Sequence, residues 1–410
     1  MVRTSGPAAD DLGDGPPATA DGRRRLLARR HGRSRLPWSL LAALVLLAPI
    51  ACAPPAEPGP VRFARVDLPG GAVPQVLAAA GDDLLVGVRH GGPEPRPGIV
   101  RIGPDGASTA LTVTPTSGYG ATASWYSLDY DGRQVVGIGG DRGGAHGNVR
   151  WSVWTGSGTA VQEQGQAFST FGGWGAGGLV DSVLTAGGPV VVGSWQSADA
   201  GLDVALWSAD GATWVRRDST GTPLASTRDA LGFPLDVAAL QQGLLVVGWQ
   251  LAAGTGGSAP VAWRSASGQE PWTRTPLPDA GTSGAATAVR CVESTCAVSG
   301  RVDGVLALWR LTGDRWSRVA DVPPVPVGAR GPLPAPLNPA GPLVQVVPDG
   351  ARITILRLDE AGSTQRPAEG PTGTAVSAVE AGGSLFLLAG ANQEELELWR
   401  ADASALRLPT

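Results

Sequence analysis

The sequence predicts an all-β fold in which one four-stranded unit is repeated about seven times. Three observations support this fold class. A motif of apolar strand residues, an anchor that is usually Trp, a small or polar turn and an Arg recurs along the chain. A run of apolar residues that usually ends in Gly precedes each anchor, as in Leu244–Gly248. The anchors are 43 to 56 residues apart, a spacing typical of the blades of a β-propeller.

The clearest repeat runs from Val204 to Arg216 and contains Trp207, an Asp-Gly turn and Trp214. Each repeat has four short strands joined by Gly- and Asp-rich turns, which is the content of one antiparallel blade. The anchors are Ile102, Trp154, Trp207, Trp263, Trp309, Leu356 and Trp399. The sequence therefore predicts a single β-propeller over residues 61–410, with seven blades and a range of six to eight.

The two ends of the repeat region predict how the ring closes. Phe63–Pro69 matches the last strand of other repeats, yet it precedes the first complete repeat. The final repeat has only a short and weak outer strand of its own, Ala405–Pro409. We therefore expect Phe63–Pro69 to complete the final blade, because closure of this kind removes open sheet edges.

The composition agrees with a repeated β structure. The 60 Gly and 35 Pro provide turns, and many of the 14 Trp fall in the repeats. Because 42% of the residues are hydrophobic and only 17% are charged, the chain can bury a core. Collagen, a coiled coil and a polytopic membrane protein are excluded, since the sequence has no Gly triplet period, no heptad and no series of apolar 20-residue segments.

Residues 1–51 have the pattern of a signal peptide. A basic segment, Arg23–Arg35, precedes the apolar run Leu36–Ala51, which is shorter than the roughly 20 residues that span a bilayer. Cys52 follows directly, and this arrangement resembles the lipobox of bacterial lipoproteins. The resemblance implies lipid attachment at Cys52, although Pro49 stands where the motif normally has Leu. Simple secretion and an uncleaved anchor are the alternatives.

The segment after the signal and the overall charge add to the expected location. Residues 52–60 are Pro-rich and predict a stiff tether. All 32 basic residues are Arg, which is typical of a GC-rich genome, and with the lipobox this indicates an actinobacterial type of protein. We expect a lipoprotein on the outer face of the cytoplasmic membrane, or a secreted protein. Residues 52–410 carry a net charge of −8, which argues against nucleic acid as a partner.

Two cysteines agree with export. Cys291 and Cys296 lie on two alternating strands separated by four residues. A hairpin would place them opposite each other, and an oxidising compartment would permit a disulfide. A reduced pair is the alternative. A metal site would need further Cys or His nearby, and the sequence has none there, so we predict no metal.

The turn Ser208-x-Asp210-Gly211-x-x-Trp214 resembles the Asp-box of sialidases and BNR-repeat propellers, with one residue fewer. The resemblance implies a structural turn in which Asp and Ser side chains accept hydrogen bonds from backbone amides. A sialidase also needs an arginine triad, a Tyr–Glu pair and an Asp acid, and the sequence suggests no such set. We predict no catalytic residue and no cofactor, and enzyme activity is left open. Asp129–Gly132 is interpreted as a hairpin turn rather than a calcium loop.

Aromatic and charged residues occur in the loops that would lead into the innermost strands. Side chains of these types, converging on a concave face, suit a glycan or a peptide ligand. The alternative is that the aromatic rings fill gaps between blades. The candidate ligand-binding residues are Tyr119, Trp125, Phe171, Trp174, Arg228 and Asp229.

The sequence thus leaves two functional hypotheses. The first is a monomeric, surface-anchored and non-catalytic propeller that binds or scaffolds an envelope protein, peptide or glycan. The second is a secreted propeller related to Asp-box proteins that binds or hydrolyses glycans. An acidic cluster beside paired arginines at the channel mouth would favour the second hypothesis, and an apolar channel the first.

Overall fold

The computed structural model describes residues 59–143, 147–211, 213–252, 254, 256–329, 331–392 and 394–406. The predicted signal peptide (residues 1–51), Cys52 and the tether up to residue 58 lie outside these residues. Within the described part of the chain, no helix is both long enough and apolar enough to cross a membrane.

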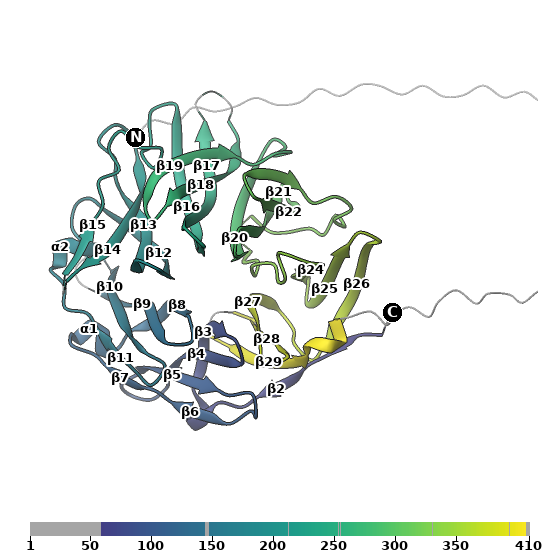
Figure 1. Ribbon diagram of the computed structural model, residues 1–410. Helices are drawn as coiled ribbons and strands as arrows, with labels where there is room; N and C mark the ends of the chain where they lie inside the picture. Colours follow the sequence, from purple (N-terminus) through teal and green to yellow (C-terminus); the bar gives the residue numbers. More distant parts are fainter. Residues whose placement is uncertain are drawn as a thin grey trace, which may run out of the picture. The chain divides into compact units, whose positions relative to one another are not determined.

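The described chain forms seven sheets arranged as blades in a ring, which confirms the predicted propeller and its blade count (Figure 1). We number the blades by their innermost strands. Blade 1 contains β3 (Val73–Ala80), β4 (Asp83–His90), β5 (Arg96–Ile102) and β6 (Ser108–Ala110). Blade 2 contains β8 (Ser124–Tyr130), β9 (Gln134–Gly143), β10 (Asn148–Ser157) and β11 (Ala160–Glu163), with β7 (Thr112–Thr114) paired parallel to β11. Blade 3 contains β12 (Ala176–Thr185), β13 (Gly188–Gln196), β14 (Leu202–Asp210) and β15 (Thr213–Arg216).

The other blades continue around the ring. Blade 4 contains β16 (Ala230–Leu240), β17 (Gly243–Ala252), β18 (Ser258–Ser267) and β19 (Glu270–Pro276). Blade 5 contains β20 (Gly284–Val292), β21 (Thr295–Val302), β22 (Val305–Thr312) and β23 (Arg315–Arg318). Blade 6 contains β24 (Leu343–Asp349), β25 (Arg352–Asp359), β26 (Gly362–Glu369) and β1 (Val61–Arg62). Blade 7 contains β27 (Thr374–Ala381), β28 (Ser384–Gly390), β29 (Leu396–Asp402) and β2 (Ala64–Val66). The short helices are α1 (Gly118–Ala121), α2 (Phe168–Phe171), and the 3-10 turns η1 (Pro69–Gly71) and η2 (Ala403–Leu406).

The hydrophobic core lies between the blades rather than within any one of them. Buried residues form seven clusters among the described residues, and each cluster joins two neighbouring blades. One cluster packs Val86 of blade 1 against Leu388 of blade 7, so the last blade contacts the first. Each blade therefore depends on both neighbours for the burial of its apolar faces.

The N-terminal segment completes two blades instead of one. β1 pairs parallel to β26 and supplies the outer strand of blade 6, whereas β2 pairs antiparallel to β29 and supplies the outer strand of blade 7. The predicted closure by Phe63–Pro69 therefore holds for blade 7, but blade 6 also lacks an outer strand of its own. Ala405–Pro409 was expected to be a weak strand. Ala405 and Leu406 instead belong to η2, and the remainder lies outside the described residues.

The repeated Trp and Arg of the motif lie opposite each other on neighbouring strands, and in two motifs the Arg lies over the Trp ring, in the pairs Arg274–Trp263 and Arg318–Trp309. Trp207, Trp263 and Trp309 are almost fully buried. Each indole N–H donates to a carbonyl in the segment that leads into its own blade, at 2.8, 3.1 and 2.8 Å. The Arg of each motif lies directly opposite its Trp on the outer strand, in the pairs Trp207–Arg216, Trp263–Arg274 and Trp309–Arg318. The motif thus joins the third and fourth strands of a blade to each other and to the segment that leads into that blade.

The recurrent Gly of the second strand lies beside a β-bulge in the innermost strand. The register of β16 against β17 shifts between Pro234 and Asp236, and Gly248 faces this irregularity. A Cβ atom on Gly248 would lie 2.0 Å from the carbonyl oxygen of Phe233. Gly300 has the same relation to the bulge of β20, where a Cβ would lie 2.1 Å from the oxygen of Ala285. Glycine is therefore required here by the close approach of the backbone.

Candidate functional site

The innermost strands surround a channel with a cavity of about 1780 Å³. Residues of β3, β8, β12, β16, β20 and β27 line it. Blade 6 contributes instead through the Pro-rich segment Gly331–Ala335, which precedes β24. The Pro334 carbonyl accepts hydrogen bonds from the buried Ser299 Oγ and Gln345 Nε2, each at 3.0 Å, and these bonds hold the segment at the channel wall.

The predicted aromatic residues divide into exposed and buried pairs. Tyr119 on α1 is 40% exposed, and Trp174, just after α2, is fully exposed. Trp125 is 4% exposed, and its indole N–H donates to the Gly98 carbonyl at 2.9 Å. Phe171 is 3% exposed and packs 5.5 Å from the Trp207 ring. Trp125 and Phe171 therefore pack between blades, while Tyr119 and Trp174 are accessible to a ligand.

The predicted charged pair lies in the loop that leads into β16. The Arg228 guanidinium lies 3.6 Å from the Asp199 carboxylate, and the Arg228 side chain is 85% exposed. Asp229 is also exposed. Within the described structure, Trp125 is the one member of the six predicted ligand-binding residues that borders the channel.

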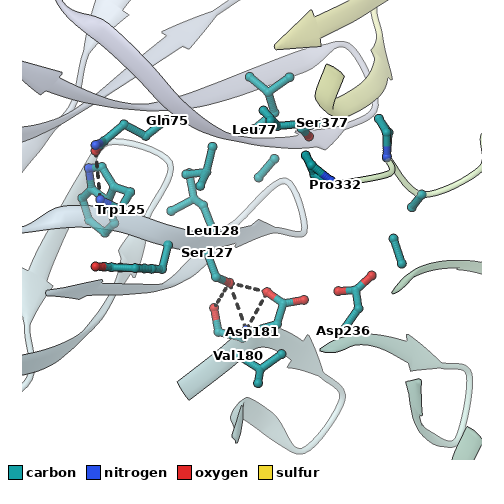
Figure 2. A pocket seen from close by; sticks show the side chains of 18 of the residues that line it. Gln75, Leu77, Trp125, Ser127, Leu128, Val180, Asp181, Asp236, Pro332 and Ser377 are labelled. Atoms are coloured by element: carbon teal, nitrogen blue, oxygen red, sulfur yellow. Dashed lines mark hydrogen bonds between the residues drawn. The ribbon is translucent and has the colours of Figure 1, made fainter. Parts of the chain in front are cut away.

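The acidic residues of the channel were not predicted as a site, although Asp129 was assigned to a hairpin turn. Asp129, Asp181 and Asp236 lie on the innermost strands of blades 2, 3 and 4 and line the cavity. Figure 2 shows Asp181 and Asp236 side by side, with Ser127 next to Asp181. The sequence signal was a single Asp after an aliphatic residue in three successive inner strands. It was hidden because Asp is also frequent in the turns of this chain.

These carboxyls accept hydrogen bonds that join neighbouring blades. Asp129 Oδ2 accepts from the backbone N–H of Leu184 on blade 3 at 2.7 Å. Asp236 Oδ2 accepts from the backbone N–H of Val289 on blade 5 at 2.6 Å. Asp181 Oδ1 accepts from the Ser127 hydroxyl on blade 2, and the Asp181 carboxyl lies beside the carboxyl of Asp236 (Figure 2). The three acids thus connect blades 2 to 5 along the channel wall.

One arginine lies among these acids. Arg290 on β20 is half-buried, and its Nη2 donates to the Ala378 carbonyl on blade 7 at 2.9 Å. Burial lowers the pKa of Arg290, while the nearby Asp236, Glu380 and Asp129 act to raise it. Arg290 thus lies among the acidic residues, and Arg89, Arg142 and Arg301 also line the cavity.

Burial and neighbouring carboxyls raise the pKa of two of the channel acids, Asp129 and Asp236. Burial in the channel wall raises the pKa of Asp236 well above its ordinary value, and the adjacent Asp181 raises it further. Burial raises the pKa of Asp129 from 3.8 to about 6. The neighbouring Asp181 disfavours ionisation of Asp236, because like charges repel each other strongly in a buried site.

Replacement of Asp181 by Asn is expected to stabilise the protein at neutral pH. The amide nitrogen of the introduced Asn would donate a hydrogen bond to the ionised Asp236 carboxylate, which would then not need to be protonated. The amide oxygen would still accept the hydrogen bond from the Ser127 hydroxyl. The raised pKa of Asp236 in the folded chain means that its protonated form stabilises the fold at low pH, and this contribution is lost as the pH rises through the raised pKa. Asp181→Asn should raise stability at pH 7.5 by about 1 kcal/mol and flatten its decline with pH.

Thermal unfolding between pH 5 and pH 8 checks this expectation. Asp236→Asn is the matched control, because both Asp236 oxygens accept backbone N–H groups and an amide nitrogen cannot replace either oxygen. This control should destabilise the protein. Equal destabilisation by the two variants would contradict an unfavourable interaction between Asp181 and Asp236 at neutral pH.

Other predicted features occupy structural positions. Cys291 and Cys296 form a disulfide across the β20–β21 hairpin, with Cα atoms 4.1 Å apart, as predicted. Asp131 Oδ1 accepts from the backbone N–H groups of Arg133 and Gln134 at 2.8 and 2.7 Å, which is the geometry of a hairpin turn. In the Asp-box-like turn, Ser208 Oγ accepts from the side-chain Nε of Arg217 at 2.9 Å and not, as expected, from a backbone amide. No group of three or more potential metal ligands occurs among the described residues.

The fold and the channel define the class of this protein as a seven-bladed β-propeller. No family model and no curated protein matches the chain. Among solved structures, it is similar to a puromycin-hydrolyzing peptidase of Mycobacterium tuberculosis, with a TM-score of 0.52 and 12% identity over 86% of this chain and 56% of the peptidase chain. The chain therefore spans little more than half of that peptidase, and the likeness shows the fold alone.

Two further structures are similar over most of their own length. The β-propeller domain of the Trilobed protease from Pyrococcus furiosus has a TM-score of 0.44 and 9% identity, over 81% of this chain and 95% of that domain. The polysaccharide lyase Uly1 has a TM-score of 0.48 and 9% identity, over 86% of this chain and 94% of the lyase.

Proposed function

We propose that the protein is a non-catalytic binding module, anchored at the outer face of the cytoplasmic membrane through Cys52, that holds an envelope polysaccharide. Exposed aromatic rings in the segments that lead into the innermost strands carry this proposal. Trp174 is fully exposed, Phe168 is 65% exposed and Tyr119 is 40% exposed. Exposed aromatic rings are costly in water and mark interaction sites, and flat rings suit the apolar faces of sugars.

A cation adds polarity to this aromatic surface. The Arg150 guanidinium lies 5.0 Å from the centre of the Phe168 ring. An arginine held over an aromatic ring keeps free N–H groups that can donate to hydroxyl or carboxylate oxygens. The combination supports binding of a polar ligand with ring faces, as a polysaccharide has.

The acidic residues of the channel support binding rather than hydrolysis. Glycosidases hold two carboxyls about 5–9.5 Å apart, so that a sugar or a sugar and a water fit between them. Asp181 and Asp236 instead lie side by side, and Asp181 raises the pKa of Asp236 (Figure 2). Both oxygens of Asp236 also accept backbone N–H groups. These contacts favour a structural role for the pair over acid–base catalysis.

Sedimentation with purified bacterial cell-wall sacculi tests the proposal. The double variant Phe168→Ala with Trp174→Ala should bind sacculi about tenfold more weakly than the wild type and should unfold at the same temperature, because both side chains are exposed. Val215→Ala is the control, since Val215 is 40% exposed but lies on the outer strand β15. Unchanged binding by the double variant, or an equal loss in the control, would contradict the proposal.

A further inference from the structure

Four half-buried arginines have a pKa that burial lowers, and three of them have partners. Arg274 Nε donates to Gln250 Oε1 at 2.9 Å. Arg290 donates to the Ala378 carbonyl, and Arg318 lies 4.9 Å from the Trp309 ring. The fourth, Arg301, makes no side-chain hydrogen bond, ion pair or ring contact with any described residue.

Arg301 lies in the wall of the channel, next to Gly300 on β21. It pairs with Ala285, one residue before the bulge of β20. Arg89 occupies the equivalent position on blade 1, where it pairs with Val73 one residue before the bulge of β3. Arg89 also lines the channel, and its Nε is buried without a hydrogen-bond partner.

A half-buried guanidinium without a counter-charge is unfavourable for folding. Such groups are retained where a ligand supplies the missing charge. We propose that Arg301 and Arg89 bind carboxylate groups of an acidic polysaccharide at the channel mouth. The planar guanidinium matches a carboxylate in a two-point hydrogen bond, which an ammonium group cannot make. This inference rests on the proposed function and specifies the chemistry of its ligand.

An aromatic residue at the same level supports a sugar as the carrier of the carboxylate. Trp249 occupies the equivalent position on β17, where it pairs with Phe233 one residue before the bulge of β16. It lines the channel, and its ring lies 4.0 Å from the Phe233 ring at an interplanar angle of 11°. An indole that is held in place by stacking provides a rigid surface for a pyranose ring.

Two arginines on separate blades also favour a repeating anion. Arg89 lies on blade 1 and Arg301 on blade 5, so one small anion would leave one of them unpaired. A chain of uronic acids presents one carboxylate in every residue, so one ligand can reach both arginines. The size of the cavity, about 1780 Å³, accommodates several sugar residues.

Calorimetric titration of the full chain with an oligogalacturonate tests the proposal. The wild type should bind the oligogalacturonate about tenfold or more tightly than its carboxyl-reduced, neutral counterpart. Arg301→Gln should remove this preference, and Arg301→Lys should restore only part of it, because Lys keeps the charge but not the fork. Arg264→Gln is the control, since Arg264 already pairs with Asp314 and does not border the channel. It should bind as the wild type does.

The outcomes separate this inference from the proposed function. Equal binding of the acidic and neutral oligosaccharides, with no effect of Arg301→Gln, would overturn the carboxylate site and leave a polysaccharide-binding module. Tighter binding of a peptide with a free carboxyl terminus than of its amidated form, without binding of either oligosaccharide, would overturn it in favour of a peptide ligand. Absence of binding to both oligosaccharides and to sacculi would overturn the inference together with the proposed function.

Discussion

Deletion of residues 61–69 from the full chain is expected to lower the melting temperature strongly and to promote association. This segment contains β1 and β2, the outer strands of blades 6 and 7. Val61 is fully buried and Phe63 is 8% exposed, and both pack in the cluster between these blades. Loss of the two apolar side chains alone should cost about 3–6 kcal/mol. Loss of the strands also exposes the edges of β26 and β29.

Thermal unfolding and light scattering measure the two effects of this deletion. Removal of residues 53–58 is a suitable control, because that segment precedes both strands. An unchanged melting temperature in the 61–69 variant would mean that the N-terminal strands do not hold the ring closed.

Replacement of Trp309 by Ala is expected to destabilise the protein by about 3–5 kcal/mol. Trp309 is fully buried between blades 4 and 5, and its indole N–H donates to the Pro278 carbonyl at 2.8 Å. The change would leave a cavity, an unpaired carbonyl and a half-buried Arg318 without its ring partner. Trp309→Phe should cost less, because it keeps most of the apolar volume but loses the N–H donor.

Chemical denaturation quantifies this loss. Trp174→Ala is the matched control, since the same chemical change is made at a fully exposed position. It should alter the free energy of unfolding by less than about 0.5 kcal/mol. Comparable losses at Trp174 and Trp309 would show that the repeated Trp has no special role between blades.

Repetition made the architecture predictable from the sequence. Trp207, Trp263 and Trp309 occupy equivalent positions, because each faces the Arg of its own motif on the adjacent outer strand. A residue that serves the same contact several times appears as a periodic signal. The recurrent Gly is also explained by the structure, since the bulge brings a carbonyl close to Gly248 and Gly300. The outer strand of blade 6 was not predicted, because two residues of β1 carry no recognisable pattern.

The candidate site was predicted less well, for a physical reason. Aromatic residues near a bulge pack between blades or face solvent according to the direction of the side chain, and sequence alone did not separate Trp125 from Trp174. The channel acids were missed because Asp181 and Asp236 act through contacts between different repeats. Arg301 gave no signal either, because its distinguishing property is the absence of a partner among the described residues.

Hydrogen–deuterium exchange with and without soluble fragments of cell-wall polysaccharide directly tests whether a polysaccharide binds at the mouth of the channel. We expect protection in the segments that contain Tyr119 and Trp174 and in the parts of β4, β17 and β21 next to their bulges. The outer strands β15, β19 and β23 should exchange at the same rate in both samples. Protection confined to the outer strands, or no protection anywhere, would contradict a ligand site at the mouth of the channel.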